Sequence, residues 1–129
     1  MTLGIEWLAI ANVTEGIELR KAGIVTPDIL VFGCDYVDCL AETAKYNLIL
    51  TIYSLDIPCK SNNVSRYSQT FHLEVDTGMG RTGILFSELS EVTALLKSAS
   101  NIQLEGCFTH LACADEPDAQ LTKKLVKVV

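Results

Sequence analysis

The chain has 129 residues, is 49% hydrophobic and carries a formal net charge of −6, which fits one globular domain. This acidic balance disfavours nucleic acid as a partner, because phosphate backbones would be repelled. No apolar run approaches the roughly 18 residues of a membrane span, and the opening MTLGIEW lacks the pattern of a signal peptide. Five cysteines without C-x-x-C spacing indicate reduced thiols. We therefore expect a cytoplasmic domain without a metal site.

Short apolar strands alternate with helices along the chain. Five strands are predicted, at 1–11 (buried), 29–32, 48–53, 71–76 and 104–110. Helices are predicted at 13–22, 36–46 and 87–98, with a last one after residue 118. Strands that alternate with helices at this spacing predict a parallel α/β arrangement with about five β/α units.

Polar residues and glycine set the predicted helix boundaries. Four residues are placed to cap the first turns: Asn12, Asp35, Ser87 and Asp118. Glu15 completes a capping box with Asn12, and Gly23 ends the first helix because glycine tolerates a left-handed cap. Residues 59–70 are rich in serine and asparagine, which compete with helical hydrogen bonds, so at most two turns of helix are expected there.

The stretch 71–84, FHLEVDTGMGRTGI, is where we expect the functional site. It begins as a strand and continues into a loop with three of the eight glycines, Gly78, Gly80 and Gly83, around Arg81. Such dense glycine indicates positive φ or a close approach of the backbone. A glycine loop with one cation at the carboxyl end of a strand is typical of sites in α/β proteins.

The same loop satisfies G-x-G-x-x-G at residues 78–83, the pattern of dinucleotide-binding sites. Its context disfavours that function. The apolar residues 84–86 separate the loop from the predicted helix, and the next strand ends in Thr109 and His110 where an acid is required.

Three stretches together resemble the alanine racemases, which are fold-type III pyridoxal-phosphate enzymes. LEVDTGMGRTGI is similar to their signature loop. The segment from AIA at 9–11 to EGIELRKAGI at 15–24 is similar to "VA…EG-x-x-LR-x-AGI", and LEGCFTHLA at 104–112 to "LEG-x-x-THFA". The matches occur in the family's order and span nearly the whole chain.

This resemblance implies that residues 1–129 form part of an N-terminal (β/α)₈ barrel domain. The family interconverts L- and D-alanine with pyridoxal phosphate, supplies D-alanine for the cell wall, and is homodimeric at full length. A complete barrel takes about 250 residues, so the predicted units make about half of one. We expect an open sheet with edge strands near Leu8 and Phe108, which would promote association.

The resemblance also implies roles for two residues. Arg81 would be the catalytic and cofactor-binding arginine that approaches the phenolic oxygen of the cofactor and the substrate carboxylate, since a guanidinium keeps its charge and donates in a fixed fork. His110 would be a cofactor-binding residue in the polar network near the pyridine ring. Without the resemblance, Arg81 could be a loop cation paired with an acid, and His110 an ordinary hydrogen-bonded residue. Asp76 and Thr77 are expected to brace the loop.

Glu74 departs from the family pattern, because many members carry there a lysine that becomes carbamylated. Glutamate supplies a carboxylate directly, and strand alternation turns it toward the barrel interior. An unpaired carboxylate is costly there. We therefore predict an ion pair between Glu74 and Arg81, with a contact of about 2.8 Å.

None of the seven lysines lies in a setting like the VKANAYGHG strand that carries the family's cofactor lysine. The family's tyrosine base and phosphate-binding loops are expected beyond residue 129. The isolated chain is therefore expected to be inactive, as a fragment of a racemase. Two alternatives stay open: a non-catalytic remnant that binds a pyridoxal-like or anionic ligand at Arg81, and a racemase for serine or another small amino acid.

Overall fold

The computed structural model describes residues 4–33, 39–58, 68–116 and 120–125. The strands are β1 (Trp7–Ile10), β2 (Asp28–Val31), β3 (Ile49–Ile52), β4 (Gln69–Asp76), β5 (Ile84–Leu85) and β6 (Ile102–Phe108). The helices are α1 (Val13–Lys21), α2 (Leu40–Lys45), the 3₁₀ turn η1 (Phe86–Glu88), α4 (Leu89–Ser98) and α5 (Gln120–Leu125). Every strand pairing is parallel. The predicted parallel α/β arrangement is confirmed.

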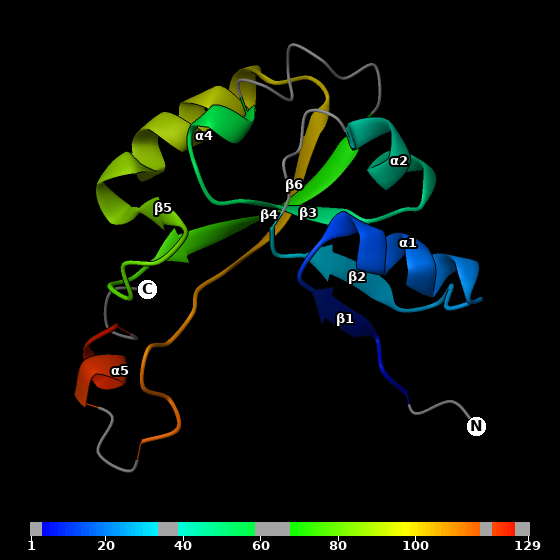
Figure 1. Cartoon of the computed structure of the whole chain (residues 1–129). Helices are drawn as coiled ribbons and strands as arrows, with labels where there is room; N and C mark the ends of the chain where they lie inside the picture. The colour runs from blue at the N-terminus through cyan, green and yellow to red at the C-terminus, as the bar shows by residue number, and fades with distance from the viewer. Residues whose placement is uncertain (1–3, 34–38, 59–67, 117–119, 126–129) are drawn as a thin grey trace.

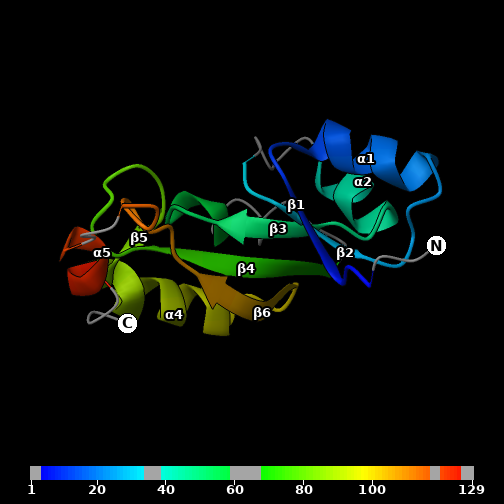
Figure 2. The same ribbon diagram turned by 90° about the horizontal axis from the view of Figure 1, so that it is seen from below.

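The sheet runs in the order β1-β2-β3-β4, and β6 lies beside β4. The short β5 pairs with the last two residues of β4. Helices α1, α2 and α4 lie along one side of the sheet (Figure 1), and the view from below shows the strands uncovered between them (Figure 2). The strands β2 and β3 lie inside the sheet and are almost wholly buried.

The sheet curves strongly enough for side chains of distant strands to meet. The ring of Trp7 on β1 lies 5.1 Å from the ring of His72 on β4, although two strands separate β1 from β4. This curvature fits a partial barrel. Among the described strands, β1 pairs only with β2, and β6 pairs only with β4, so the two predicted edge strands are edges.

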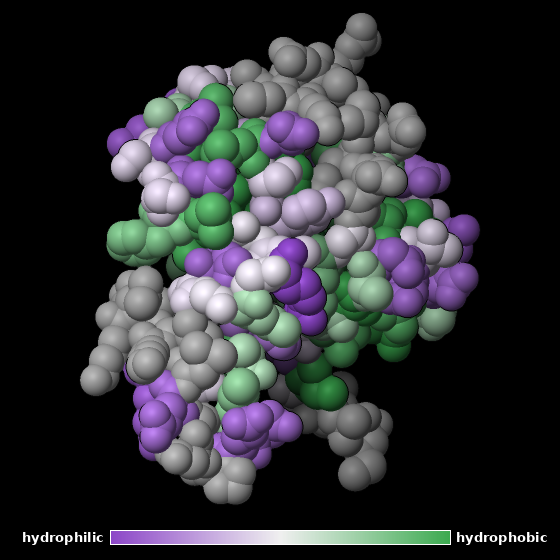
Figure 3. Space-filling view, turned by 60° about the vertical axis from the view of Figure 1, so that its left-hand side comes forward, coloured by the Kyte–Doolittle hydropathy of each residue, from purple (hydrophilic) through white to green (hydrophobic). Residues whose placement is uncertain are grey.

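The first strand is shorter and more exposed than predicted. Residues 1–11 were expected to be buried, yet Trp7 is 43% and Ile5 52% exposed, because β1 has a neighbour on one side only. Apolar residues also reach the surface near the glycine loop, where Leu85 and Phe86 are 51% and 61% exposed. Figure 3 likewise shows green apolar residues among purple polar ones on the face that it views.

Helix α1 follows the sequence prediction closely. The Asn12 side chain accepts a hydrogen bond from the Glu15 amide (3.1 Å), and the Glu15 carboxylate accepts one from the Ala11 amide (2.9 Å). At the other end Gly23 takes a φ of 89°, and the Gly23 and Ile24 amides donate to the Arg20 and Leu19 carbonyls. This pair of bonds is a Schellman cap.

Helix α4 begins differently from the prediction. Ser87 lies inside η1 and caps nothing; Glu88 is the residue before α4, and its carboxylate accepts a hydrogen bond from the Leu85 amide (2.9 Å). The loop therefore leads into a short strand and a 3₁₀ turn before any α-helix, which argues against the dinucleotide fingerprint. The end of α4 at Ser98 is confirmed. Strand β6 starts two residues earlier than predicted and ends before His110.

Some predictions lie outside the described residues. These are the Asp35 cap, the start of the second helix at 36, the content of 59–67 and the Asp118 cap. Helix α2 begins at Leu40. None of the described helices has the length and apolar content that crossing a membrane requires. Cys39, Cys107 and Cys113 form no disulfide among the described residues.

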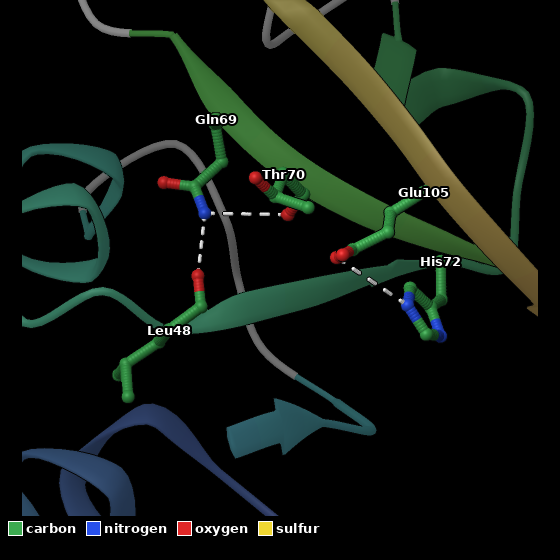
Figure 4. A network of polar contacts seen from close by, with 5 residues as sticks. All are labelled: Leu48, Gln69, Thr70, His72 and Glu105. Atoms are coloured by element: carbon green, nitrogen blue, oxygen red, sulfur yellow. Dashed lines mark hydrogen bonds and ion pairs between the residues drawn. The ribbon is translucent and has the colours of Figure 1, made fainter. Parts of the chain in front are cut away.

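Two further sets of polar contacts involve β4 (Figure 4). The Gln69 amide, at the start of β4, donates to the Leu48 carbonyl (2.6 Å) and the Thr70 carbonyl (3.3 Å). His72 Nε2 lies 3.8 Å from the Glu105 carboxylate, which is too far for a hydrogen bond. The first contacts link the start of β4 to the residue before β3, and the second places His72 of β4 near Glu105 of β6.

Candidate functional site

A cavity of ≈500 Å³ opens at the carboxyl ends of four strands. Its lining residues come from positions after β1 and β2, from β4, from the glycine loop and from the end of β6: Ala11, Phe32, Gly33, Glu74, Arg81, Thr82, Phe108, Thr109 and His110. This end of a parallel sheet is where β/α barrels hold their sites, and the volume lies in the range of small-molecule pockets. The structure therefore brings Arg81 and His110, both predicted site residues, to one cavity.

Asp76 organises the start of the glycine loop. Its carboxylate accepts hydrogen bonds from the Gly78 amide (2.8 Å) and from the Gly80 amide (3.1 and 3.0 Å to its two oxygens). The Gly80 bond, followed by the Gly78 bond, lowers the pKa of Asp76 from its ordinary value, because both favour the charged form. The Thr77 and Thr109 hydroxyls lie 2.9 Å apart and join β4 to the end of β6. The predicted bracing of the loop is confirmed for Asp76, whereas the Thr77 hydroxyl contacts Thr109 instead of a loop amide.

Gly83 closes the loop against the strand from which it started. It has a φ of 114°, and a Cβ placed there would lie 2.7 Å from the Asp76 nitrogen and 3.1 Å from the Val75 carbonyl carbon. No side chain fits so close to backbone atoms, so glycine is required here. Directly afterwards β5 pairs with Val75 and Asp76. Both ends of the loop are therefore fixed to β4.

Arg81 lies between these two fixed ends. It is exposed, and no hydrogen bond or ion pair joins it to another residue in the part of the chain that the structure describes. His110 is exposed at the same cavity, two residues beyond β6. A guanidinium that lines a cavity and has no partner among the described residues is able to bind an anionic group.

The predicted ion pair between Glu74 and Arg81 is not formed. Glu74 is buried, 6% exposed, and its Oε1 accepts a hydrogen bond from the Thr82 hydroxyl (3.0 Å). Because Gly83 folds the loop tightly onto β4, it is Thr82 that comes within hydrogen-bond distance of the carboxylate. The expectation that a buried Glu74 needs a partner was right, and the partner named was wrong.

The sequence did not point to an aromatic wall of this cavity. Phe32 follows β2 and Phe108 ends β6, and their ring centroids lie 5.6 Å apart at 52°. Residues 29–32 are wholly apolar and Phe108 lies within the predicted strand 104–110, so nothing local marked these two residues as different from core. Only the meeting of the strand ends in space reveals them. Thr82 was missed because its hydrogen bond joins it to Glu74, eight residues earlier on β4.

Comparisons with known proteins agree with the residues quoted above. The sequence profile of the family described as "Alanine racemase, N-terminal domain" matches residues 1–128. Alanine racemase 2 of Bacillus subtilis is 42% identical over 126 residues, which cover 93% of this chain and 32% of that protein. The alanine racemase of Clostridium tetani is 43% identical over 129 residues, with the same two coverages.

A solved structure shares the fold. The alanine racemase of Clostridium difficile, in complex with cycloserine, superposes with a TM-score of 0.85 at 35% sequence identity. The superposition covers 95% of this chain and 34% of that one. The chain thus spans about a third of the length of each of these relatives.

Proposed function

Because the chain belongs to the alanine racemase family and matches its N-terminal domain over residues 1–128, we propose that it supplies part of the barrel of a pyridoxal-phosphate-dependent racemase. The reaction is the interconversion of L- and D-alanine, in a cytoplasmic protein that is homodimeric at full length. The observation that carries this proposal is the cavity at the strand ends, which Arg81 and His110 both line.

The residues present suit the cofactor. Pyridoxal phosphate, when bound, supplies the electron delocalisation that makes the α-proton of an amino acid removable. Its planar ring and anionic oxygens call for apolar aromatic walls and a cation. The cavity offers Phe32 and Phe108 for the first requirement and Arg81 for the second.

The chain's own residues would then bind and orient. Arg81 would hold the phenolic oxygen of the cofactor and the carboxylate of the substrate, since its donors are not used elsewhere in the described residues. His110 would take part in the polar contacts near the pyridine ring. Phe32 and Phe108 would exclude water from this side of the cavity, which strengthens the electrostatic contacts inside.

No lysine lines the cavity in the described part of the chain. In the proposed enzyme, the lysine that attaches the cofactor would therefore come from outside the described lining of this cavity. We infer that a polypeptide of these 129 residues alone does not racemise alanine. Mixed with pyridoxal phosphate and borohydride, it should give no stoichiometric adduct on one lysine and no D-alanine. Trapping of a single specific lysine together with D-alanine production would contradict this.

A chimera tests the function itself. This chain would replace the matching third of the Bacillus subtilis relative, to which it is 42% identical, and racemisation of L-alanine and of L-serine would be measured. We expect alanine racemisation that Arg81→Ala abolishes and Arg81→Lys restores only weakly, because lysine lacks the planar fork. A chimera that folds and binds pyridoxal phosphate but racemises neither amino acid would contradict the proposal.

One observation favours a non-catalytic module as the second candidate. The Glu74 carboxylate bonds to Thr82 instead of Arg81, so the polar contacts around the arginine differ from those that the resemblance implies. Such a module would bind a pyridoxal-like or anionic ligand at Arg81 without chemistry. The inactive but cofactor-binding chimera is the outcome that supports it.

A further inference from the structure

Two consecutive residues of the glycine loop, Arg81 and Thr82, line the same cavity as the buried carboxylate of Glu74. Thr82 already donates to it at 3.0 Å, whereas Arg81 lines the same cavity without contacting it. Building on the proposed function, we propose that Thr82 is a positioning residue for Arg81. By occupying the Glu74 carboxylate, the Thr82 hydroxyl keeps the acid from pairing with Arg81 and leaves the guanidinium free for an anionic ligand.

Glu74 cannot go without a partner. Its side chain is 6% exposed, and a buried carboxylate is costly unless a donor compensates for the lost water. The donors that line this cavity include the Thr82 hydroxyl, the Arg81 guanidinium and His110. If the hydroxyl were removed, the guanidinium would be the stronger replacement, because a charged donor forms the stronger bond to a carboxylate.

The backbone of the loop cannot easily take part in this exchange. Asp76 holds the Gly78 and Gly80 amides, and Gly83 rests against the backbone of β4. The pairing of β5 with β4 follows directly. Arg81 and Thr82 are therefore held at fixed places over the strand end, and the choice of partner for Glu74 falls to their side chains.

For an anionic ligand, the consequence is whether an internal ion pair of Arg81 has to break before the ligand binds. An anion that approaches a paired arginine has to compete with an internal carboxylate, whereas one that approaches a free arginine does not. With Thr82 on Glu74, the cavity presents a cation ready for a small carboxylate or phenolate. The Glu74 carboxylate stays bonded to Thr82 and does not pair with the Arg81 guanidinium.

Arginine-specific chemical modification tests this on the chain as it is. Phenylglyoxal reacts with free guanidinium groups, and peptide mass spectrometry reports the rate at each of the three arginines, Arg20, Arg66 and Arg81. Arg20 serves as the internal slow control, because its guanidinium donates to four backbone carbonyls. We expect Arg81 to react faster than Arg20 in the wild type.

Three variants separate the hydroxyl from general effects of the loop. Thr82→Val has nearly the same shape without the hydroxyl, and should slow modification of Arg81 about tenfold, the factor that a charged hydrogen bond provides. Thr82→Ser keeps the hydroxyl and should react like the wild type. Adding Glu74→Gln to Thr82→Val removes the competing charge and should restore the fast rate.

Two results would overturn the proposal. One is an unchanged Arg81 rate in Thr82→Val, with folding confirmed by circular dichroism and by the slow Arg20 control. The other is a faster Arg81 rate in Glu74→Gln alone, because that would mean that Glu74 already protects Arg81 in the wild type. If Thr82→Val does not fold, the rate of Arg81 modification in Glu74→Gln alone still tests the proposal. None of these measurements requires cofactor or activity, so this inference can fail independently of the chimera.

Discussion

Two arginines in this protein lie in family-like motifs and are used in opposite ways. Arg20, near the end of α1, donates to the carbonyls of Tyr46 (3.0 Å), Ile24 (2.9 Å), Pro27 (2.8 Å) and Asn47 (3.1 Å). Arg81, in the glycine loop, donates to nothing in the described residues and faces the cavity.

The difference lies in the surrounding backbone. The ends of α1 and α2 leave carbonyls that need donors, and one planar guanidinium with five N–H groups can satisfy several of them. In the glycine loop the Asp76 carboxylate accepts from the Gly78 and Gly80 amides, and Arg81 forms no hydrogen bond with a described residue. A sequence motif therefore does not distinguish a structural arginine from one that is available to a ligand. The hydrogen-bond partners in the structure make this distinction.

The largest effect should come from removing the structural arginine. Arg20→Ala leaves four carbonyls without their donor and disconnects α1 from α2. We expect a loss of about 3 kcal/mol in the free energy of unfolding, by urea titration. Arg20→Lys should recover little of it, because an ammonium group cannot reach four carbonyls in fixed directions.

Arg81→Ala is the matched control for that measurement. Its side chain has no protein partner in the described residues, so the free energy of unfolding should change by less than about 0.5 kcal/mol. Equal losses for the two alanine variants would show that Arg81 has a structural partner in solution. The comparison between the two arginines would then fail.

The second prediction concerns the backbone of the glycine loop. Gly83 holds this backbone close to β4, although the Arg81 side chain forms no hydrogen bond with a described residue. Gly83→Ala would place a Cβ 2.7 Å from the Asp76 nitrogen at a φ of 114°. We expect a loss of about 2 kcal/mol, limited by the cost of detaching the loop from β4.

Gly80→Ala is the control for Gly83. Gly80 has a positive φ of 71°, yet a Cβ there meets nothing within 4 Å. It should lose only the left-handed penalty of about 1 kcal/mol. If Gly80→Ala proves as damaging as Gly83→Ala, backbone conformation and not close approach explains the glycines of this loop.

The parts of the fold that could be predicted are those set by local sequence. The capping of α1 by Asn12 and Glu15 and the glycine at its end depend on residues a few positions apart. The parallel order follows from strands that alternate with helices. The position of Arg81 and His110 at one end of the sheet follows from the same rule.

What could not be predicted depends on contacts between distant segments. Nothing in the sequence singled out Gln69, which is 4% exposed: its amide nitrogen donates to the Leu48 carbonyl, and its oxygen accepts from the Thr43 hydroxyl at 3.1 Å. Strand β5 exists only because Gly83 brings the chain back onto β4. The same return decides that Thr82, and not Arg81, contacts Glu74.

The smallest effect concerns the Asp76 carboxylate that holds the loop amides. Hydrogen bonds from Gly80 and Gly78 lower its pKa in the folded protein below the ordinary value of 3.8. A depressed folded pKa means that the unfolded chain binds the proton first as the pH falls. The contribution to stability is therefore fully present above the unfolded pKa and is lost as the pH falls through the folded pKa.

The Asp76→Asn variant isolates this contribution from other acids. Its oxygen still accepts amide hydrogen bonds, but it cannot titrate, so the wild type should be the more stable protein at neutral pH. That difference should stay constant from about pH 7 to pH 5 and shrink below about pH 4. Urea unfolding of both proteins across this range measures it, and solvent screening at this partly exposed site keeps the difference small. A difference that grows toward acid would mean that the loop amides do not favour the charged carboxylate, and the glycine loop would then owe its shape to Gly83 and β5 alone.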